Sequence, residues 1–337
     1  MKLGVLVLSM QLATQLAASA AFGQGLNAEV AATAGASTDA VAAAATQARV
    51  FGGLRGLNVF AEAAWAHTAV ADGRSSEAFS TAYPYEGPLR VMDAYLEKRV
   101  GGGQVFGSIR AGRFRTPFGI YAASEHAYNG FLRAPLIRYE GYWSISNMLL
   151  EHGVNLMAGT PRLQAEVTVG HPADVSDDFS RRSGVDVVLR AQTYVGPFVV
   201  GASHMRSETY DRPYAAGGMQ FTGVDLRWMS HGVQVRGEWL TGRPWNDTRT
   251  RGGYVDVSLH RPFMGPLTLV TRLEHLDYDT PEPAYSDEAS GVAIGGRVAL
   301  RDGLYAQVNV THRPSEPYGQ NHTAADVALT YTLRYRR

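Results

Sequence analysis

Apolar and polar residues alternate along most of the chain. Between residues 291 and 301, Val292, Ile294 and Val298 occupy one set of alternate positions, and Arg297 and Arg301 occupy the other. Residues 221–229, 231–240 and 326–336 repeat the pattern. A period of two places successive side chains on opposite faces of a β-strand. The sequence therefore predicts strands that each carry one apolar face and one polar face.

The alternating segments are about ten residues long, which is the length that a tilted strand needs to cross a bilayer. They occur in pairs, and short connections with glycine or proline join the pairs at residues 101–103, 159–161, 196–197, 231–232, 265–266 and 302–303. Longer polar segments separate the pairs at residues 209–218, 242–250, 280–290 and 313–322. Short periplasmic turns and long external loops are typical of an outer-membrane β-barrel.

The pattern predicts an all-β protein, a transmembrane antiparallel up-and-down β-barrel of about sixteen strands, with about twelve to fourteen as the alternative. The expected strands are 26–34, 47–55, 57–67, 89–99, 104–114, 151–158, 162–171, 183–194, 197–208, 219–230, 233–244, 250–262, 266–279, 289–301, 303–314 and 323–335. An even number of strands places both termini in the periplasm. The alanine-rich stretch at 40–48 blurs the first two strands, and residues 40–47 are expected to form a helical turn or two.

A soluble β-sandwich would also show alternation. Against it, the strand pairs recur evenly to the end of the chain, and the polar faces carry charges of both signs, which suits a hydrated lumen. The apolar faces are expected to carry aromatic residues near strand ends, at Tyr254, Tyr305 and Tyr335. Tyrosine, with 17 residues, is abundant in the chain, and its ring suits a membrane interface.

The first twenty residues have the layout of a secretory signal peptide. Lys2 precedes a mostly apolar run from residue 3 to residue 13, and Ala18-Ser19-Ala20 forms a small-x-small cleavage pattern. The apolar run is too short to span a bilayer, which takes about 20 residues. We therefore expect a signal peptide at 1–20, cleaved after Ala20 or after Gly23, and a barrel at 21–337. An amphipathic N-terminal helix is the alternative.

Charge and cysteine content narrow the function classes. The chain has 31 basic and 31 acidic residues, so it lacks the basic field of a nucleic-acid binder. It has no cysteine, which removes disulfides, thiolate zinc sites and cysteine nucleophiles. Common hydrolase and phosphate-loop motifs do not occur, so we predict neither an enzyme nor a cofactor. Ser203 with His204, or Glu151 with His152, could serve a rim hydrolase, but a lone histidine on a strand is more often a wall residue.

The polar strand faces assign a set of side chains to the lumen. These are Asp186, Arg190, Gln192, Asp225, Arg227, Gln234, Arg236, Glu238, Asp256, Ser258, His260, Arg272, Glu274, Arg297, Gln307, Asn309, Thr330, Thr332 and Arg334. Six of them are arginines and five are acids, and this near balance predicts weak ion selectivity at most. Charges on facing walls would create a transverse field that orients polar solutes. Alternatively, they pair on neighbouring strands and stiffen the wall.

The segment 115–150 is too long for an incidental connection. It is also too apolar for a solvated loop, since it contains Phe118, Ile120, Tyr121, Phe131, Leu132, Leu136, Ile137, Tyr139, Tyr142 and Trp143. We expect it to fold inward and narrow the pore; an outward lid or a subunit-packing loop is the alternative. The predicted pore-lining and constriction residues are Arg115, Arg133, Arg138, Glu140, Arg190, Arg227, Arg236, Glu238, Arg272, Glu274 and Arg297.

An acidic segment is a further candidate for ligand binding. Its residues are Asp277, Asp279, Glu282, Asp287 and Glu288. The carboxylates of Asp277, Asp279 and Glu282 could hold a calcium ion. They show no fixed ligand spacing, and a solvated acidic loop is the simpler interpretation.

Three stretches carry a family resemblance. Residues 110–121 read RAGRFRTPFGIY, residues 223–243 read GVDLRWMSHGVQVRGEWLTGR, and residues 267–279 read LTLVTRLEHLDYD. They resemble segments of the phosphate-selective porin family and of the wider group of Gram-negative outer-membrane porins. The resemblance implies a solute-conducting barrel of about sixteen strands, often trimeric. It does not extend to phosphate selectivity, because family selectivity rests on lumenal arginines and lysines and lysine occurs here only at Lys2 and Lys98. The C-terminus also departs from the family, whose barrels usually end in an aromatic residue, whereas this chain ends Tyr335-Arg336-Arg337.

We therefore predict an outer-membrane porin, a passive diffusion channel for small hydrophilic or anionic solutes in the bacterial cell outer membrane. The expected partners are outer-membrane lipid, lipopolysaccharide and the solutes themselves, with the homotrimer that the resemblance implies. One alternative is a non-conducting barrel that acts as a receptor, an anchor or an adhesion platform. An outer-membrane hydrolase is less favoured.

Overall fold

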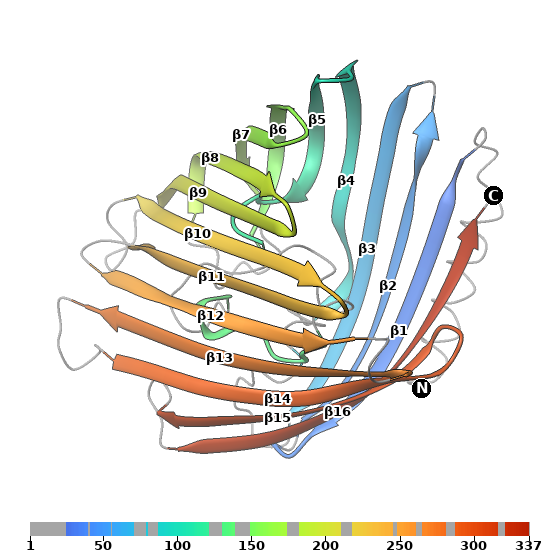
Figure 1. Ribbon diagram of the computed structural model, residues 1–337, viewed down its shortest axis with the longest axis vertical. Helices are drawn as coiled ribbons and strands as arrows, with labels where there is room; N and C mark the ends of the chain where they lie inside the picture. The colour runs from blue at the N-terminus through green and yellow to red at the C-terminus, as the bar shows by residue number, and fades with distance from the viewer. Residues whose placement is uncertain are drawn as a thin grey trace.

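The computed structural model describes residues 25–39, 41–54, 56–70, 79, 87–120, 130–138, 149–173, 182–209, 218–244, 248–260, 265–280, 287–315 and 321–336. Its strands are β1 (Asn27–Ser37), β2 (Val41–Leu54), β3 (Leu57–Val70), β4 (Gly87–Gly102), β5 (Val105–Arg115), β6 (Leu150–Gly159), β7 (Leu163–Pro172), β8 (Arg182–Val195), β9 (Phe198–Thr209), β10 (Met219–Ser230), β11 (Val233–Arg243), β12 (Arg249–Leu259), β13 (Leu267–Asp279), β14 (Asp287–Arg301), β15 (Leu304–Ser315) and β16 (His322–Arg336). Each strand pairs antiparallel with its neighbours, and β1 pairs with β16, which closes the barrel (Figure 1). The predicted sixteen-stranded all-β barrel is confirmed.

Helical structure is minor among the residues that the structure describes. A short 3-10 helix, η1 (Leu136–Arg138), follows residues 130–135 in the connection between β5 and β6. No helix in the described part of the chain is long and apolar enough to cross a membrane.

The alanine-rich stretch at 40–47 was expected to be helical, and this expectation is wrong. Residues 41–47 belong to β2, which pairs with β1 on one side and with β3 on the other. Backbone pairing on both sides overrides the helix propensity of alanine. The small inward side chains of Ala43 and Ala45 also leave room for two buried residues from the connections, Phe79 and Leu132.

The two faces of the wall differ in polarity. Large apolar side chains such as Leu189, Val224 and Leu273 point outward and stay exposed, whereas Arg190, Asp225 and Glu274 at adjacent positions are buried on the inner face. This alternation gives a transmembrane barrel its apolar outer band and polar lumen. Two tyrosines depart from the expectation. The side chain of Tyr254 is only 3% exposed and shares the inner face with Asp256, and Tyr305 shares that face with Gln307.

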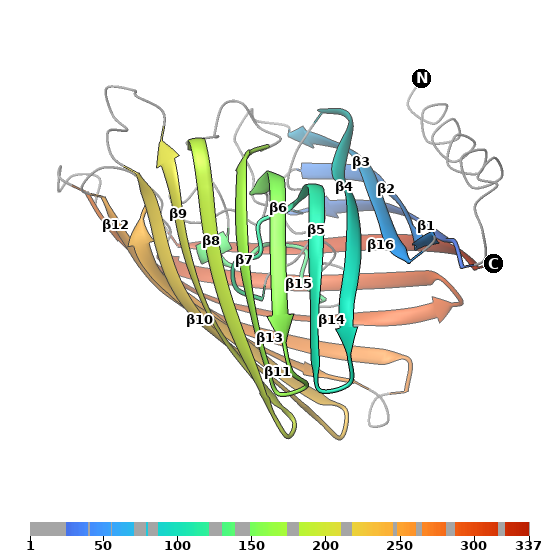
Figure 2. The ribbon, with the colours of Figure 1, turned by 90° about the horizontal axis from the view of Figure 1, so that it is seen from above.

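Short hairpin turns join the strands at one end of the barrel (Figure 2). In the turn between β10 and β11, His231 and Gly232 both have positive φ, at 47° and 80°. Two consecutive left-handed residues match the right-handed twist of the flanking strands. The longer connections, including residues 116–149 between β5 and β6, leave from the opposite end.

An apolar core lies inside the barrel, between the β5–β6 connection and the inner wall of β8–β14. The connection contributes Phe118, Ile120, Leu136 and Ile137. The wall contributes Val188, Met205, Met219, Phe221, Leu240, Tyr254, Leu276, Tyr278 and Ala289. The inner face is therefore polar only in part, because an apolar area there is covered by the connection rather than by water.

Candidate functional site

The described parts of the β5–β6 connection, residues 116–120 and 130–138, lie against the inner wall. The backbone N–H of Gly119 donates to Ser203 Oγ at 3.0 Å on β9. The N–H of Leu136 donates to Glu274 Oε2 at 3.0 Å on β13. The N–H of Leu132 donates to Asn309 Oδ1 at 3.1 Å on β15. The connection therefore crosses the interior and contacts widely separated strands.

Arg133 fastens the connection near the β1–β2 turn. Its Nε donates to Asp326 Oδ2 at 2.6 Å, and its Nη2 donates to Asp39 Oδ2 at 2.6 Å and to Ser37 Oγ at 3.1 Å. His322 Nε2 lies 2.8 Å from Asp39 Oδ1. Burial opposes the charged form of Asp39, but the hydrogen bonds and charges of Arg133 and His322 outweigh it and hold the pKa of this carboxyl below its usual value.

A second buried ion pair joins Arg138 to Glu238 on β11. The Arg138 Nε lies 3.2 Å from Glu238 Oε2, and Nη2 bonds the other carboxylate oxygen. The same Nη2 donates to the carbonyl oxygen of Phe118 at 2.9 Å. The pair therefore holds both described parts of the connection together against one strand.

Arg272 on β13 links the connection to a chain of wall charges. Its Nη1 donates to the carbonyl oxygen of Arg133 at 2.8 Å, and its Nε donates to Asp256 Oδ1 at 2.7 Å. Asp256 also accepts from Arg236 Nη2 at 2.8 Å. The Arg272 guanidinium lies 4.2 Å from the ring centre of Phe131, which adds a cation–π contact.

The remaining predicted arginines of the inner wall divide by exposure. Arg115 bonds Asp93 at 2.9 Å, and Arg190 bonds Asp225 at 2.7 Å, and both guanidinium groups are largely buried. Arg227 and Arg297 are half-buried. Arg227 donates to Gln192 Oε1 at 3.0 Å, and the Arg297 guanidinium lies 4.0 Å from the ring centre of Tyr305.

Sequence reasoning missed several charged residues of the inner wall. Arg313 is fully buried and bonds Glu274 at 2.9 Å. Arg110 bonds Glu97 at 3.1 Å and is partly exposed. Strand parity could have found Arg313, because it lies on the same inward face of β15 as Asn309. Arg110 was assigned only to the motif at residues 110–121, so its inward position was not predicted.

Other predicted sites have separate outcomes. Glu140 and Glu282 lie outside the described residues. Asp277 pairs with Arg251 at 2.5 Å on the outer face, and no group of three or more candidate metal ligands occurs in the described ranges. Ser203 Oγ faces inward and accepts from Arg190 at 2.8 Å, whereas His204 Nδ1 lies 2.9 Å from Thr222 Oγ1 on the outer face. Ser203 and His204 therefore form no dyad.

The glutamate–histidine pair of β6 is divided in the same way. The Glu151 carboxylate is buried and accepts from Thr116 Oγ1 at 2.7 Å. His152 is exposed and lies 3.3 Å from an Arg113 nitrogen. Adjacent residues of a strand point to opposite faces, so these two side chains cannot act on one substrate.

Comparison with models of known protein families found no match, and a search of characterised proteins found none either. Solved structures do resemble the chain. OmpF of Salmonella typhi, in complex with daunomycin, has a TM-score of 0.64 at 14% identity and covers 91% of this chain and 97% of its own. An anion-selective porin from Comamonas acidovorans has a TM-score of 0.58 at 12% identity, covering 92% and 98%. A triple mutant of the Rhodopseudomonas blastica porin has a TM-score of 0.51 at 11% identity, covering 91% and 99%. These similarities show that the chain has a porin-like fold.

Proposed function

We propose that the protein is an outer-membrane porin, a passive diffusion channel for small hydrophilic or anionic solutes. The observation that carries this proposal is the combination of a closed sixteen-stranded barrel with a connection fastened to its inner wall. A wall of about sixteen strands encloses a lumen wider than side chains alone can fill. The apolar outer band fits the bacterial outer membrane, and the similar porin structures support the same location.

We assign different roles to the predicted pore-lining residues. Arg133 and Arg138 are 3% and 2% exposed, so they serve as anchors of the segment that narrows the lumen. Arg227 and Arg297 keep solvent exposure and can meet a solute. Most other arginines of the inner wall, such as Arg272, are paired with carboxylates. Paired charges leave a weak net field, which predicts weak selectivity for anions.

A non-conducting barrel is the second candidate, and one observation favours it. The apolar core inside the barrel covers the inner wall from β8 to β14. If the connection between β5 and β6 filled the lumen completely, ions could not cross the barrel. Such a barrel would serve as a receptor, an anchor or an adhesion platform. The two candidates differ in whether ions cross the barrel.

Planar-bilayer recording separates the candidates. Purified protein should give stepwise conductance. In a salt gradient, the reversal potential should be close to zero, and its sign should be the one expected for a channel that prefers anions. Deletion of residues 122–146 should raise the single-channel conductance if the connection forms the constriction. Unchanged conductance after this deletion would refute the constriction but leave the channel intact. Absence of any channel from folded protein would refute the porin proposal.

The N-terminal segment and the oligomeric state are further parts of the proposed function. We propose that residues 1–20 are a signal peptide, which N-terminal sequencing of the mature protein tests directly. A homotrimer is the proposed assembly, and the mass of the native protein in detergent tests it. A mature protein that starts at residue 1 would contradict the first proposal, and a monomeric mass would contradict the second.

A further inference from the structure

Three neighbouring strands, β2 to β4, carry a row of aromatic side chains on the inner wall of the barrel (Figure 1). Phe51 lies opposite Phe60, and Phe60 lies opposite Tyr95, in the register of these strands. Phe60 and Tyr95 are each two positions from a buried inner-face acid, Glu62 and Asp93, so strand alternation places the rings on the inner face. Phe51 is 40% exposed and the other two rings are half-buried. This aromatic row therefore faces the lumen.

The rings of the aromatic row stack on one another. The ring centroids of Phe51 and Phe60 are 6.5 Å apart with planes at 28°, and those of Phe60 and Tyr95 are 5.2 Å apart with planes at 13°. The Arg110 guanidinium lies 4.6 Å from the ring centre of Tyr95. Tyr95 on β4 is therefore held between Phe60 on β3 and Arg110 on β5. Because its two faces are occupied, the Tyr95 ring meets the lumen with its edge.

Gly112 permits this arrangement at β5. It lies opposite Tyr95 in the register, has φ +136°, and a Cβ there would meet the Tyr95 Cα at 2.8 Å. Since no side chain stands at this position, Arg110 and Phe114 on either side of it both reach the Tyr95 ring. The Phe114 ring meets it edge-on, with centroids 6.4 Å apart and planes at 89°.

The aromatic row runs obliquely along the lumen. Phe51 and Phe60 lie near the short turn between β2 and β3, and Tyr95 lies near the middle of β4. Phe114 is near the end of β5, where the β5–β6 connection begins. A solute that passes through the lumen can therefore follow the row from the short-turn end toward the connection.

Polar side chains border the row on the side of the short turns. Asn58, Glu97 and Arg110 lie opposite one another in the register, next to the aromatic positions. Glu97 accepts from Asn58 Nδ2 at 3.4 Å, from Arg99 Nε at 3.1 Å and from Arg110 Nη2 at 3.1 Å. The side chain of Arg99 is 79% exposed, so its guanidinium stays in contact with water. This border offers hydrogen-bond donors beside a carboxylate acceptor.

The opposite border is a set of closed ion pairs. Arg115 bonds Glu62 at 3.2 Å and Asp93 at 2.9 Å, and Arg49 bonds Glu29 at 3.2 Å. Basic and acidic side chains are therefore close to balance around the aromatic row, which favours a solute without net charge.

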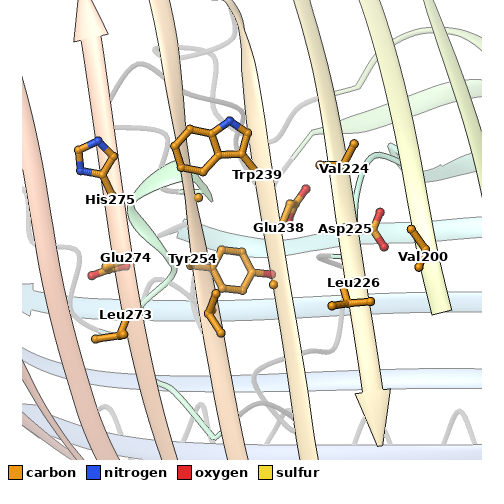
Figure 3. Close-up of a pocket in the computed structure, with 13 residues that line it drawn as sticks. Val200, Val224, Asp225, Leu226, Glu238, Trp239, Tyr254, Leu273, Glu274 and His275 are labelled. Atoms are coloured by element: carbon orange, nitrogen blue, oxygen red, sulfur yellow. The ribbon is translucent and has the colours of Figure 1, made fainter. Parts of the chain in front are cut away.

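The wall across the barrel is covered instead. Figure 3 shows it around a hollow of the outer face, where Glu238, Tyr254 and Glu274 alternate with the outward Trp239 and Leu273. The first three are buried, because the β5–β6 connection packs on that inner wall. The aromatic row, in contrast, stays in contact with water.

We propose that the aromatic row binds the pyranose rings of a neutral carbohydrate as it passes through the lumen. This rests on the proposed function, since the solute must enter the barrel. A pyranose combines apolar C–H groups, which fit the rings, with hydroxyl groups that donate and accept, which fit Arg99 and Glu97. The edges of aromatic rings carry a positive potential that also attracts hydroxyl oxygens. A planar aromatic solute would need free ring faces, and those of Tyr95 are occupied.

Calorimetric titration of the full mature protein in detergent, with planar-bilayer recording, tests the proposal. The probes are cellotriose, which has three neutral pyranose rings, sorbitol, which has hydroxyl groups without a ring, and benzoate, a charged aromatic. Cellotriose should bind at least about tenfold more tightly than either of the others and should interrupt the ion current. Equal binding of the three, or tighter binding of benzoate, would overturn the proposal.

The two readouts separate this proposal from the porin function. An ion current with no binding and no interruption by cellotriose would refute the carbohydrate site and leave the channel intact. Cellotriose binding to a folded barrel without any ion current would support the site and refute the porin function.

Matched variants test the aromatic row. The double variant Phe51→Ser, Phe60→Ser should bind cellotriose about tenfold more weakly, because two ring contacts are lost. Met229→Ser is the control, since it removes an exposed apolar side chain from the inner face of β10, across the barrel, and should bind normally. Wild-type affinity in the folded double variant would overturn the role of the row.

A second pair of variants tests the polar border. Arg99→Gln should bind cellotriose about threefold more weakly, because a charged donor is lost. Lys98→Gln, which changes the exposed cation at the next position on the outer face, should bind normally. Equal affinity of Arg99→Gln and the wild type would refute the contribution of this border.

Discussion

The buried pair of Arg138 and Glu238 should control how firmly the β5–β6 connection is held. Their side chains are 2% and 0% exposed, and Arg138 also bonds the carbonyl oxygen of Phe118. Arg138→Met would leave the Glu238 carboxylate buried without its cation. Removing one partner of such a pair costs about 3–5 kcal/mol. We expect the opening equilibrium of the connection to rise by roughly two to three and a half orders of magnitude.

Amide hydrogen exchange in detergent micelles measures this opening. Residues 130–138 should lose protection in Arg138→Met, while amides in β15 and β16 should keep theirs, because their ladders do not depend on the pair. Glu238→Gln alone should also loosen the connection, since it leaves a buried cation. The double variant should cost less than the sum of the two single variants. Exchange of residues 130–138 in Arg138→Met at the wild-type rate would show that the pair does not hold the connection.

Three further changes probe the same interior. Gly119 has φ +67°, and a Cβ there would enter the space of the buried pair, so Gly119→Ala should raise exchange of residues 116–120 by at least about tenfold, at a backbone cost of about 1–2 kcal/mol. Gly53→Ala, which meets no atom within 4 Å, is the control, and equal behaviour would contradict the steric argument. The pKa of Asp39 is lowered from 3.8, so its contribution is complete above that pH and is lost as the pH falls through the lowered value. Protection of residues 130–138 should therefore decline below about pH 4 in the wild type but less in Asp39→Asn; identical pH profiles would refute the link. The double variant Arg227→Gln, Arg297→Gln should shift the reversal potential toward cations, with the permeability ratio falling roughly twofold, and no shift would mean that solutes do not meet these residues.

The strands were predictable because their signal is local. Alternation in a segment such as 291–301 reports one apolar and one polar face without knowledge of the neighbours. The ends were less certain: β14 begins at Asp287 rather than at 289. The helical prediction for residues 40–47 was wrong because alanine can adopt either a helical or an extended backbone. The backbone pairing of β2 with β1 and β3 selects the extended conformation.

The site was predictable only in outline. Parity placed Arg190, Arg272 and Glu274 on the inner face, where the structure has them. Parity says nothing about which charges meet, because Arg133 and Asp326 are 193 residues apart in the chain. It also missed the apolar inner face near Phe221, although adjacent apolar residues at 187–189 on β8 were a signal that both faces of that wall are covered.

The sequence by itself determined the strand pattern, the hairpin turns and the face of most strand residues, with Tyr254 and Tyr305 as exceptions. These follow from side-chain polarity and from turn residues, which act over a few positions. Only the tertiary structure decided which arginines are buried in ion pairs and which stay exposed. The closed barrel brings Asp39, Glu238 and Asp326 around one connection. The arginines of this connection are buried because they contact these carboxylates. A charged side chain can leave water only where an opposite charge and its hydrogen bonds replace the solvent.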